Sequence, residues 1–401
     1  MNQKLPMINL VGQYHKIKDE IDSAISQILE SGAFINGPAV KEFSENLAAY
    51  LKQTSKGANS EEDIYVVPCA NGTDALQIAL MTLGLKPGDE VLVPAFTYVA
   101  SAEVIGLLGL TPVMIDVDRA TFNVTVENLR KSLSSKTRAI IPVHLFGQSC
   151  DMEPILQFAA ENQLFVIEDN AQAIGAEYTF SNGKVAKTGT MGTIGCTSFF
   201  PTKNLGAFGD GGALFLKDAN LAEKARMIAN HGQRIKYHHS VIGCNSRLDT
   251  IQATILNIKL KHLNEYCAAR NKAARYYTAK LKEFDPKEQF LETPAELPNS
   301  THVYHQYTLK IKNKASEGAQ STRDALKQYL ADHGIPSMIY YPLPLQEQEA
   351  FKPITRSAEN LSISKELAES VLSLPIDTEI TPRQQDVVID AIRNFFSKEK
   401  L

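Results

Sequence analysis

The chain has 401 residues, 44% of them hydrophobic, and a formal net charge of −4. This hydrophobic fraction excludes a disordered chain, and the slightly negative charge offers no basic surface for nucleic acid or for an anionic membrane. The sequence holds neither a membrane-spanning apolar segment nor an apolar N-terminal signal segment, so we expect a cytoplasmic protein. Its five cysteines are widely spaced, without a CxxC pair, which argues against a disulfide framework and a zinc knuckle.

The first part of the chain alternates between strand-like and helix-like segments. Predicted strands cover residues 90–94, 111–117, 138–146, 164–169, 193–200 and 211–217, and predicted helices cover 72–85, 125–135 and 150–163. Several of the strands are apolar at consecutive positions, which is typical of strands buried on both faces of a parallel sheet. The alternation therefore predicts an α/β fold with a large, mostly parallel, doubly wound sheet.

After residue 250 the pattern changes. Residues 248–284 are apolar at every third or fourth position and charged on the other face, which predicts one long helix. A strand at 304–312 and helices at 319–334 and 379–397 follow. We predict a large α/β domain over residues 1–250 and a smaller C-terminal α+β domain over residues 251–401, and leave open that the first ~30 residues pack on the smaller domain.

One lysine lies in an unusual setting. Residues 196–212, CTSFFPTKNLGAFGDGG, hold Lys203 among small, aromatic and glycine residues, whereas surface lysines usually lie among other charges. Either Lys203 is an ordinary loop residue or its amine is used chemically. In open α/β sheets, ligands bind beyond the carboxyl ends of the strands, so residues that follow the predicted strands are the ones able to complete a site with Lys203.

Three of these residues suit a phosphate group. Gly72 and Thr73 open a predicted helix and offer backbone N–H groups, a hydroxyl and the positive end of the helix dipole. Ser198 ends a predicted strand and adds a second hydroxyl. Such residues also serve as ordinary helix caps, so that interpretation of Gly72 and Thr73 stays open.

Three further residues suit a flat, charged ring. Tyr98 follows the strand at 90–94, where an aromatic side chain either stacks on a ligand or fills the core. Asp169 ends a buried strand, where a carboxylate needs a partner: a protonated ring nitrogen, or the N–H groups of a helix that it caps. Gln172 follows on the same turn. Phosphate, ring, ring nitrogen and amine together describe pyridoxal 5′-phosphate (PLP), which a partly desolvated lysine such as Lys203 holds as a Schiff base.

Several segments resemble one known family. CANGTDALQIAL, VPAFTYVASAEVI, EDNAQAIGA, SFFPTKNLGAFGDGGAL and NSRLDTIQATIL are similar to motifs of the DegT/StrS sugar-nucleotide aminotransferases. The resemblance runs from near residue 7 to the C-terminus and implies a PLP enzyme of fold type I, usually a homodimer with active sites at the dimer interface. The roles that it implies are Lys203 as the Schiff-base lysine, Asp169 at the pyridinium nitrogen, Gln172 near the ring, Tyr98 stacked on the ring, Gly72, Thr73 and Ser198 at the phosphate, and Asn245 at the phosphate of the neighbouring subunit.

The resemblance also bears on the substrate. Lysine at 203 favours transamination over the dehydration that some members perform, and glutamine at 172 resembles the members that act at sugar C3. This implies transfer of an amino group from L-glutamate to a UDP-linked 2-acetamido-2-deoxy-3-oxo-glucuronate, for surface-polysaccharide amino sugar synthesis; a dTDP-linked 3-oxo or 4-oxo-6-deoxyhexose is the alternative. Phe34 and Tyr341 lie in segments similar to substrate-contacting ones. Arg247 suits a carboxylate of either substrate, unless it pairs with Asp249.

The hypothesis for the mechanism is that the Lys203 amine moves a proton between the donor Cα and the cofactor, with ping-pong kinetics. Three other classes compete with this one. A PLP-dependent dehydratase is disfavoured by Lys203, a non-enzymatic PLP-binding regulator would not need that amine, and a nicotinamide-dependent oxidoreductase would need a G-x-G-x-x-G motif that is missing. His231, His238 and His239 come with no second cluster at metal-ligand spacing, so we predict no metal.

Overall fold

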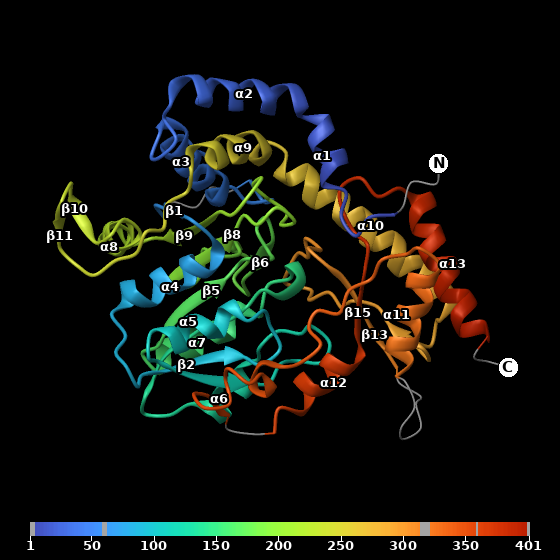
Figure 1. The fold of residues 1–401 in the computed structure, drawn as a ribbon. Helices are drawn as coiled ribbons and strands as arrows, with labels where there is room; N and C mark the ends of the chain where they lie inside the picture. The colour runs from blue at the N-terminus through green and yellow to red at the C-terminus, as the bar shows by residue number, and fades with distance from the viewer. Residues whose placement is uncertain (1–4, 58–61, 313–320, 358–359, 399–401) are drawn as a thin grey trace.

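The computed structural model describes residues 5–57, 62–312, 321–357 and 360–398 (Figure 1). The helices are α1 (Leu10–Lys16), α2 (Lys18–Ser31), α3 (Pro38–Lys52), α4 (Gly72–Leu83), α5 (Ala100–Leu107), α6 (Val126–Ser132), α7 (Met152–Glu161), α8 (Ala219–Ala229), α9 (Thr250–Leu260), α10 (Leu263–Phe284), α11 (Thr322–Asp332), α12 (Ser362–Ser370) and α13 (Pro382–Lys398). The strands are β1 (Tyr65–Cys69), β2 (Glu90–Pro94), β3 (Thr111–Ile115), β4 (Thr137–Ile140), β5 (Phe165–Asp169), β6 (Glu177–Thr179), β7 (Val185–Lys187), β8 (Ile194–Ser198), β9 (Gly212–Leu216), β10 (Gln233–Ile235), β11 (His238–His239), β12 (Leu291–Glu292), β13 (Tyr307–Ile311), β14 (Arg356–Ser357) and β15 (Val371–Leu374).

The central element is an eight-stranded sheet in the order β1-β9-β8-β5-β4-β2-β3-β14. All neighbouring pairs from β8 to β14 are parallel, whereas β9 runs antiparallel to both β8 and β1. The predicted large and mostly parallel sheet is therefore confirmed. Parallel strands place their carboxyl ends along one edge, which is where a doubly wound fold binds its ligands.

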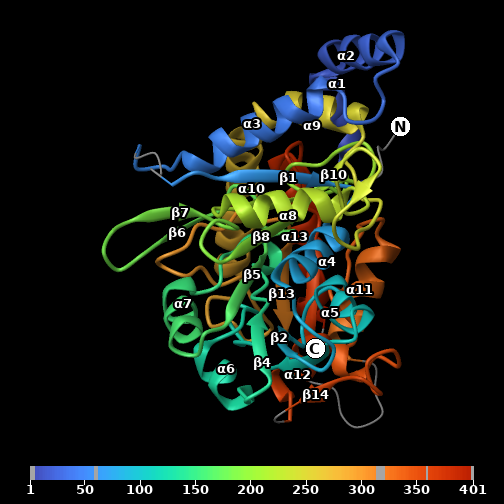
Figure 2. The same ribbon diagram turned by 90° about the vertical axis from the view of Figure 1, so that its left-hand side faces the viewer.

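Helices cover the sheet on both faces. On β9, Ala213 and Phe215 belong to a core cluster with α3 and α9, whereas Leu214 and Leu216 belong to the cluster with α4 and α8. Because successive strand residues point to opposite faces, these two clusters lie on opposite sides of the sheet. Figure 2 shows α3 and α9 on one side of β1 and α4 and α8 on the other. No helix in the described part of the chain combines the length and the hydropathy that a membrane span requires.

A second core forms in the C-terminal part of the chain. It joins α10, α11 and α13 to a three-stranded antiparallel sheet in the order β12-β13-β15, which confirms the predicted smaller α+β unit. The predicted single helix over 248–284 is wrong, because α9 ends at Leu260 and α10 begins at Leu263. The break lets α9 pack on α2 and α3 while α10 continues toward α13 (Figure 1).

Both ends of the chain cross between the two cores. β14 pairs in parallel with β3 at the edge of the large sheet. Near the N-terminus, the Asn9 backbone N–H donates to Asp377 at 2.7 Å and Lys16 forms an ion pair with Glu379 at 2.7 Å, while Ile21 packs against α9. The division of the chain at residues 250 and 251 stays a prediction.

Candidate active site

The candidate residues gather at the carboxyl edge of the large sheet. Asp169 ends β5 and is paired with Cys196 on β8, and Ser198 ends β8 two residues later. The chain then turns, with the Lys203 backbone N–H donating to the Phe200 carbonyl at 2.8 Å. Two parallel neighbouring strands thus bring the carboxylate and the lysine to the same edge, as the sequence predicts.

Lys203 is partly buried as a residue, and its amine is desolvated. Its side-chain amine forms no hydrogen bond and no ion pair with the described residues. Burial lowers the pKa of this amine to about 8, and the charge of Asp169 only partly opposes that shift. A lysine with such a pKa presents a substantial fraction of neutral amine near pH 7 to 8, which is the form that attacks a carbonyl carbon or takes up a proton.

Asp169 is buried and oriented by two donors. The Ser101 hydroxyl donates to its Oδ2 at 2.8 Å and the Ala171 backbone N–H donates to its Oδ1 at 3.1 Å. Residues 171–175 form a turn rather than a helix, so the alternative in which Asp169 caps a helix is wrong. A carboxylate with one donor on each oxygen keeps lone pairs for a further N–H group, such as a protonated ring nitrogen.

Gln172 links this carboxylate edge to an aromatic pair. Its Oε1 accepts from the Phe146 backbone N–H at 2.7 Å, and its Nε2 donates to the Tyr341 hydroxyl at 3.1 Å. The Tyr341 and Tyr98 ring centroids lie 6.1 Å apart. Tyr98 is 55% exposed, so the alternative that it fills the core is wrong, and its ring is free to cover a ligand.

The start of α4 forms a cradle beside Ser198. The Asn71 side chain caps the helix by accepting from the Asp74 N–H at 2.8 Å, while the N–H groups of Gly72 and Thr73 find no acceptor among the described residues. A Cβ atom at Gly72 would lie 2.6 Å from the Ser198 Cβ. Only glycine permits this approach, which leaves two N–H groups and a hydroxyl together at the positive end of a helix. This donor set fits a phosphate.

These eight residues are the cofactor group: Gly72, Thr73, Tyr98, Asp169, Gln172, Ser198, Lys203 and Tyr341. The other three candidates, Phe34, Asn245 and Arg247, are the outer group. Asn245 and Arg247 line a cavity of about 450 Å³ together with Ala70 and Gly209. The Phe34 carbonyl accepts from the Thr250 N–H at 2.9 Å, on the segment that follows Arg247.

The outer group is separate within one chain. No contact in the described ranges joins Phe34, Asn245 or Arg247 to Lys203 or Asp169. The alternative ion pair of Arg247 with Asp249 is absent there too, so the guanidinium keeps its donors for another partner. Within the described part of one chain, no hydrogen bond or ion pair thus links the motif that holds Asn245 and Arg247 to the lysine with which the resemblance groups it.

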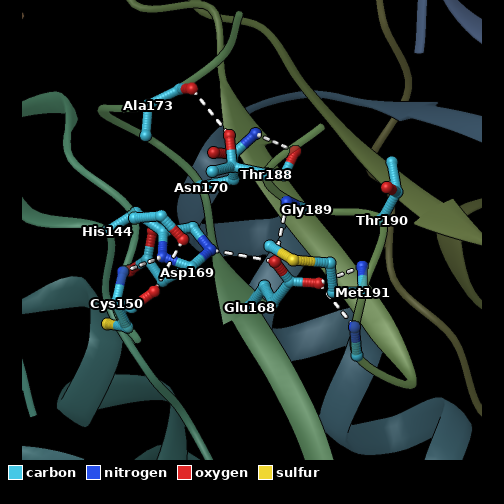
Figure 3. Close-up of polar contacts among 12 residues, drawn as sticks. His144, Cys150, Glu168, Asp169, Asn170, Ala173, Thr188, Gly189, Thr190 and Met191 are labelled. Atoms are coloured by element: carbon cyan, nitrogen blue, oxygen red, sulfur yellow. Dashed lines mark hydrogen bonds and ion pairs between the residues drawn. The ribbon is translucent and has the colours of Figure 1, made fainter. Parts of the chain in front are cut away.

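A buried carboxylate, Glu168, directly precedes Asp169 and is held by hydrogen bonds (Figure 3). Glu168 is fully buried and accepts from His144 Nε2 at 2.9 Å and from the backbone N–H groups of Gly189 at 2.8 Å, Met191 at 2.6 Å and Gly192 at 2.6 Å. Burial by itself raises the pKa of Glu168, but His144 and the backbone donors outweigh it, so this pKa lies below its ordinary value. Since His144 Nδ1 accepts from the Cys150 N–H at 3.1 Å, these bonds assign the proton to Nε2.

Sequence reasoning missed three of these supporting residues. His144 lies at the end of the predicted strand 138–146, and Ser101 lies three residues after Tyr98, so both occupy positions near strand ends, where ligands bind. Glu168 directly precedes Asp169 in the predicted strand 164–169. A rule that every buried carboxylate needs donors would have prompted a search for such partners. Among the described residues there is no cluster of three metal-ligating side chains, and the absence of a metal stays a prediction.

Comparison with known proteins decides the family. The profile of the DegT/DnrJ/EryC1/StrS aminotransferase family matches residues 15–393. The chain belongs to this family. It is 41% identical over 98% of both chains to a pleiotropic regulatory protein of Geobacillus stearothermophilus. It is 40% identical to a UDP-2-acetamido-2-deoxy-3-oxo-D-glucuronate aminotransferase of Pseudomonas aeruginosa, over 97% of this chain and all of that one.

Solved structures agree with this assignment. A family aminotransferase from Brucella abortus superposes with a TM-score of 0.87 at 38% identity, over 98% of this chain and 99% of the other. A Bacillus subtilis relative with the cofactor PMP bound has a TM-score of 0.83 at 28% identity, over 95% and 82% of the two chains. The fold is therefore PLP fold type I, and the chain is a PLP-dependent sugar aminotransferase.

Proposed function

We propose that this aminotransferase moves an amino group from L-glutamate to C3 of a 3-oxo sugar nucleotide, UDP-2-acetamido-2-deoxy-3-oxo-glucuronate, in surface-polysaccharide amino sugar synthesis. The observation that carries the chemistry is the desolvated Lys203 amine, with its pKa lowered to about 8, at the same sheet edge as Asp169. The substrate is supported by the P. aeruginosa relative that acts on this compound. Arg247, which has no ion pair in the described ranges, suits a carboxylate of glutamate or of the uronic acid.

Each residue of the cofactor group has a part in this proposal. PLP, when bound, supplies an aldehyde that joins amines covalently and a ring that takes up electrons. The Gly72 and Thr73 N–H groups and the Ser198 hydroxyl hold the phosphate, and Asp169 accepts a hydrogen bond from the ring nitrogen and keeps it protonated.

The remaining steps use side chains that face the ring. Tyr98 covers one ring face, and Gln172, fixed by Phe146 and Tyr341, lies near the ring. The Lys203 amine takes the proton from Cα of the donor and later delivers a proton to the new amine-bearing carbon of the sugar. A pKa near 8 suits both transfers, because the amine gains and loses a proton readily near neutral pH.

The separation of the outer group supports a homodimer, in which Asn245 and Arg247 of one subunit complete the site of the other. The β10–β11 hairpin, which precedes this motif, projects away from the smaller domain (Figure 1) and exposes Ile235 and Tyr237, and Ile242 just after it is exposed too. Exposed apolar side chains of this size are typical of a surface that another chain covers. We also propose that the enzyme works in the cytoplasm, because the nucleotide sugar that it needs as a substrate is present there.

Two alternatives have specific support. A relative of Streptomyces venezuelae that is 35% identical over 98% of this chain is a dTDP-3-amino-3,4,6-trideoxy-alpha-D-glucose transaminase, which favours a dTDP-linked substrate as the second candidate. The Geobacillus relative is named for regulation, which keeps a regulatory role as the third. Reaction with an amino donor separates the enzyme from a regulator, because a protein that only binds PLP through Lys203 has no need of a donor.

The test is the visible absorption spectrum of the purified protein before and after addition of L-glutamate, beside Lys203→Ala. We expect the visible absorption band of lysine-bound PLP, and we expect this band to disappear when glutamate is added. Lys203→Ala should show no such band. The bleached protein should regain the band with UDP-linked 3-oxo sugars faster than with dTDP-linked 4-oxo sugars. A protein that binds PLP through Lys203 yet ignores every amino donor would contradict the transfer reaction.

A further inference from the structure

Ser101 stands out among the buried polar groups near the site. It lies on the first turn of α5, three residues after Tyr98, and is 1% exposed. Its hydroxyl donates to Asp169 Oδ2 at 2.8 Å, and its backbone N–H donates to the Tyr98 carbonyl at 3.3 Å. One residue therefore contacts both the carboxylate and the aromatic residue of the cofactor group.

The hydrogen bond between Ser101 and Asp169 joins segments that follow two strands which are not neighbours in the sheet. Tyr98 follows β2 and Asp169 ends β5, and β4 lies between these two strands. Pairing through β4 sets the distance between the strands, but it does not fix the rotation of the Asp169 carboxyl group. The two donors that do so are the Ala171 N–H on Oδ1 and the Ser101 hydroxyl on Oδ2. Only Ser101 comes from the element that carries Tyr98.

We propose that Ser101 is a positioning residue that orients the Asp169 carboxylate toward the cofactor ring nitrogen, in register with the Tyr98 ring. The proposal rests on the cofactor chemistry of the proposed function. A hydroxyl that donates to a charged, buried acceptor is among the stronger neutral donors in proteins. Thr97 Oγ1 lies 3.5 Å from the Ser101 Oγ, at the limit of a hydrogen bond. Because the Ser101 proton points to Asp169, Thr97 is the donor in this weak contact and leaves the Ser101 hydroxyl proton free for the carboxylate.

The test measures the dissociation constants of PLP and PMP from the apoprotein by absorbance and equilibrium dialysis, without turnover. Ser101→Ala is expected to weaken both by about tenfold, because both cofactors share the ring nitrogen. In an Asp169→Asn background the same substitution should change nothing, because Ser101 acts through that carboxylate. Ser101→Thr keeps the hydroxyl and is expected to restore binding.

The matched control is Ser364→Ala. Ser364, on α12, is also fully buried and donates to an aspartate, Asp116 Oδ1, at 2.6 Å, but in the described part of the chain neither residue forms a hydrogen bond or ion pair with the cofactor group. Its loss should leave both dissociation constants unchanged. An equal loss of affinity from Ser101→Ala with and without Asp169→Asn, or an equal loss from Ser364→Ala, would overturn the proposal alone. A wild-type apoprotein without affinity for PLP would overturn the cofactor chemistry itself.

Discussion

The cofactor group and the outer group differ in how their side chains are held. Asp169 and Gln172 each accept or donate two hydrogen bonds within the chain, and both are buried. Asn245 is exposed, and Arg247 has no ion pair in the described part of the chain. The difference teaches which half of the proposed site one chain can prepare alone: hydrogen bonds within the chain hold Asp169 and Gln172 of the cofactor group, whereas Arg247 of the outer group keeps its donors free.

The physical reason lies in desolvation. A buried polar group without a partner is costly, so the fold must supply partners for every polar atom it buries beside the ring. A half-buried guanidinium without an ion pair, such as that of Arg247, keeps donors in reach of water until a carboxylate or another chain replaces that water. The comparison predicts that substitutions behind the cofactor group act on stability and cofactor affinity, and that substitution of Arg247 in the outer group acts on substrate.

The largest effect is expected from Glu168→Gln. The variant places an amide where a carboxylate accepts from four donors, which should lower the unfolding free energy by about 3 kcal/mol at pH 7. PLP binding should weaken too, because His144 bonds both to Glu168 and to the backbone carbonyl of Asp169. Urea unfolding of the apoprotein and PLP titration measure the two effects.

The same variant has a pH signature. Folding lowers the pKa of Glu168 from its ordinary 4.5, so the stability that its charge contributes is present above pH 4.5 and is lost as the pH falls through the lower folded value. The difference in unfolding free energy between wild type and Glu168→Gln should therefore become smaller in acid.

The control variant is Glu177→Gln, which removes the buried partner of Lys187 at 2.9 Å. It should lower the unfolding free energy without changing PLP affinity. Equal losses of PLP affinity in Glu168→Gln and Glu177→Gln would contradict the comparison.

Arg247→Ala is expected to act on substrate alone. Loss of a charge-assisted carboxylate contact should raise the KM of its substrate by about 30-fold, with the PLP dissociation constant unchanged. Arg247→Lys keeps the charge but not the paired donors, so it should fall between wild type and alanine. Initial rates at varied glutamate and varied sugar nucleotide assign the contact to one substrate, and a KM unchanged for both would remove Arg247 from the site.

A smaller effect concerns the pH dependence of cofactor attachment. Only the neutral Lys203 amine attacks PLP, and its pKa is lowered to about 8. The rate at which apoprotein attaches PLP should rise about tenfold per pH unit below pH 8 and level off above it. Stopped-flow absorbance gives this profile. A rate that still climbs tenfold per unit beyond pH ~9 would mean that Lys203 has the pKa of an exposed lysine.

Much of the fold could be predicted from the sequence, and the reasons are local. β2 spans the predicted residues 90–94 because the apolar run Val91–Val93 follows Gly88 and Asp89 and ends at Pro94. The prediction of one helix over 248–284 was wrong, because the apolar periodicity continues through the two residues between α9 and α10, where the chain passes from one core to the other. β14 could not be found at all, since a two-residue polar segment has no period and depends on β3 for its pairing.

The site divides in the same way. Residues at strand ends, such as Asp169, Ser198 and Tyr98, could be placed together because parallel strands share one edge. Their assigned roles stay predictions. The hydrogen bond of Gln172 to Tyr341 crosses 169 residues of chain, and no sequence period encodes a contact of that kind.

The separation of the two groups is tested most directly by subunit complementation. Lys203→Ala is co-expressed with the double variant Asn245→Ala/Arg247→Ala, and the sugar aminotransferase activity of the purified mixture is measured at substrate concentrations below KM. If each site takes its lysine from one chain and its outer group from the other, half of the mixed dimers' sites are intact and the mixture regains about a quarter of wild-type activity. Activity no greater than that of the two variants measured apart would contradict the shared site. It would mean that the lysine and the outer group of each site come from the same chain.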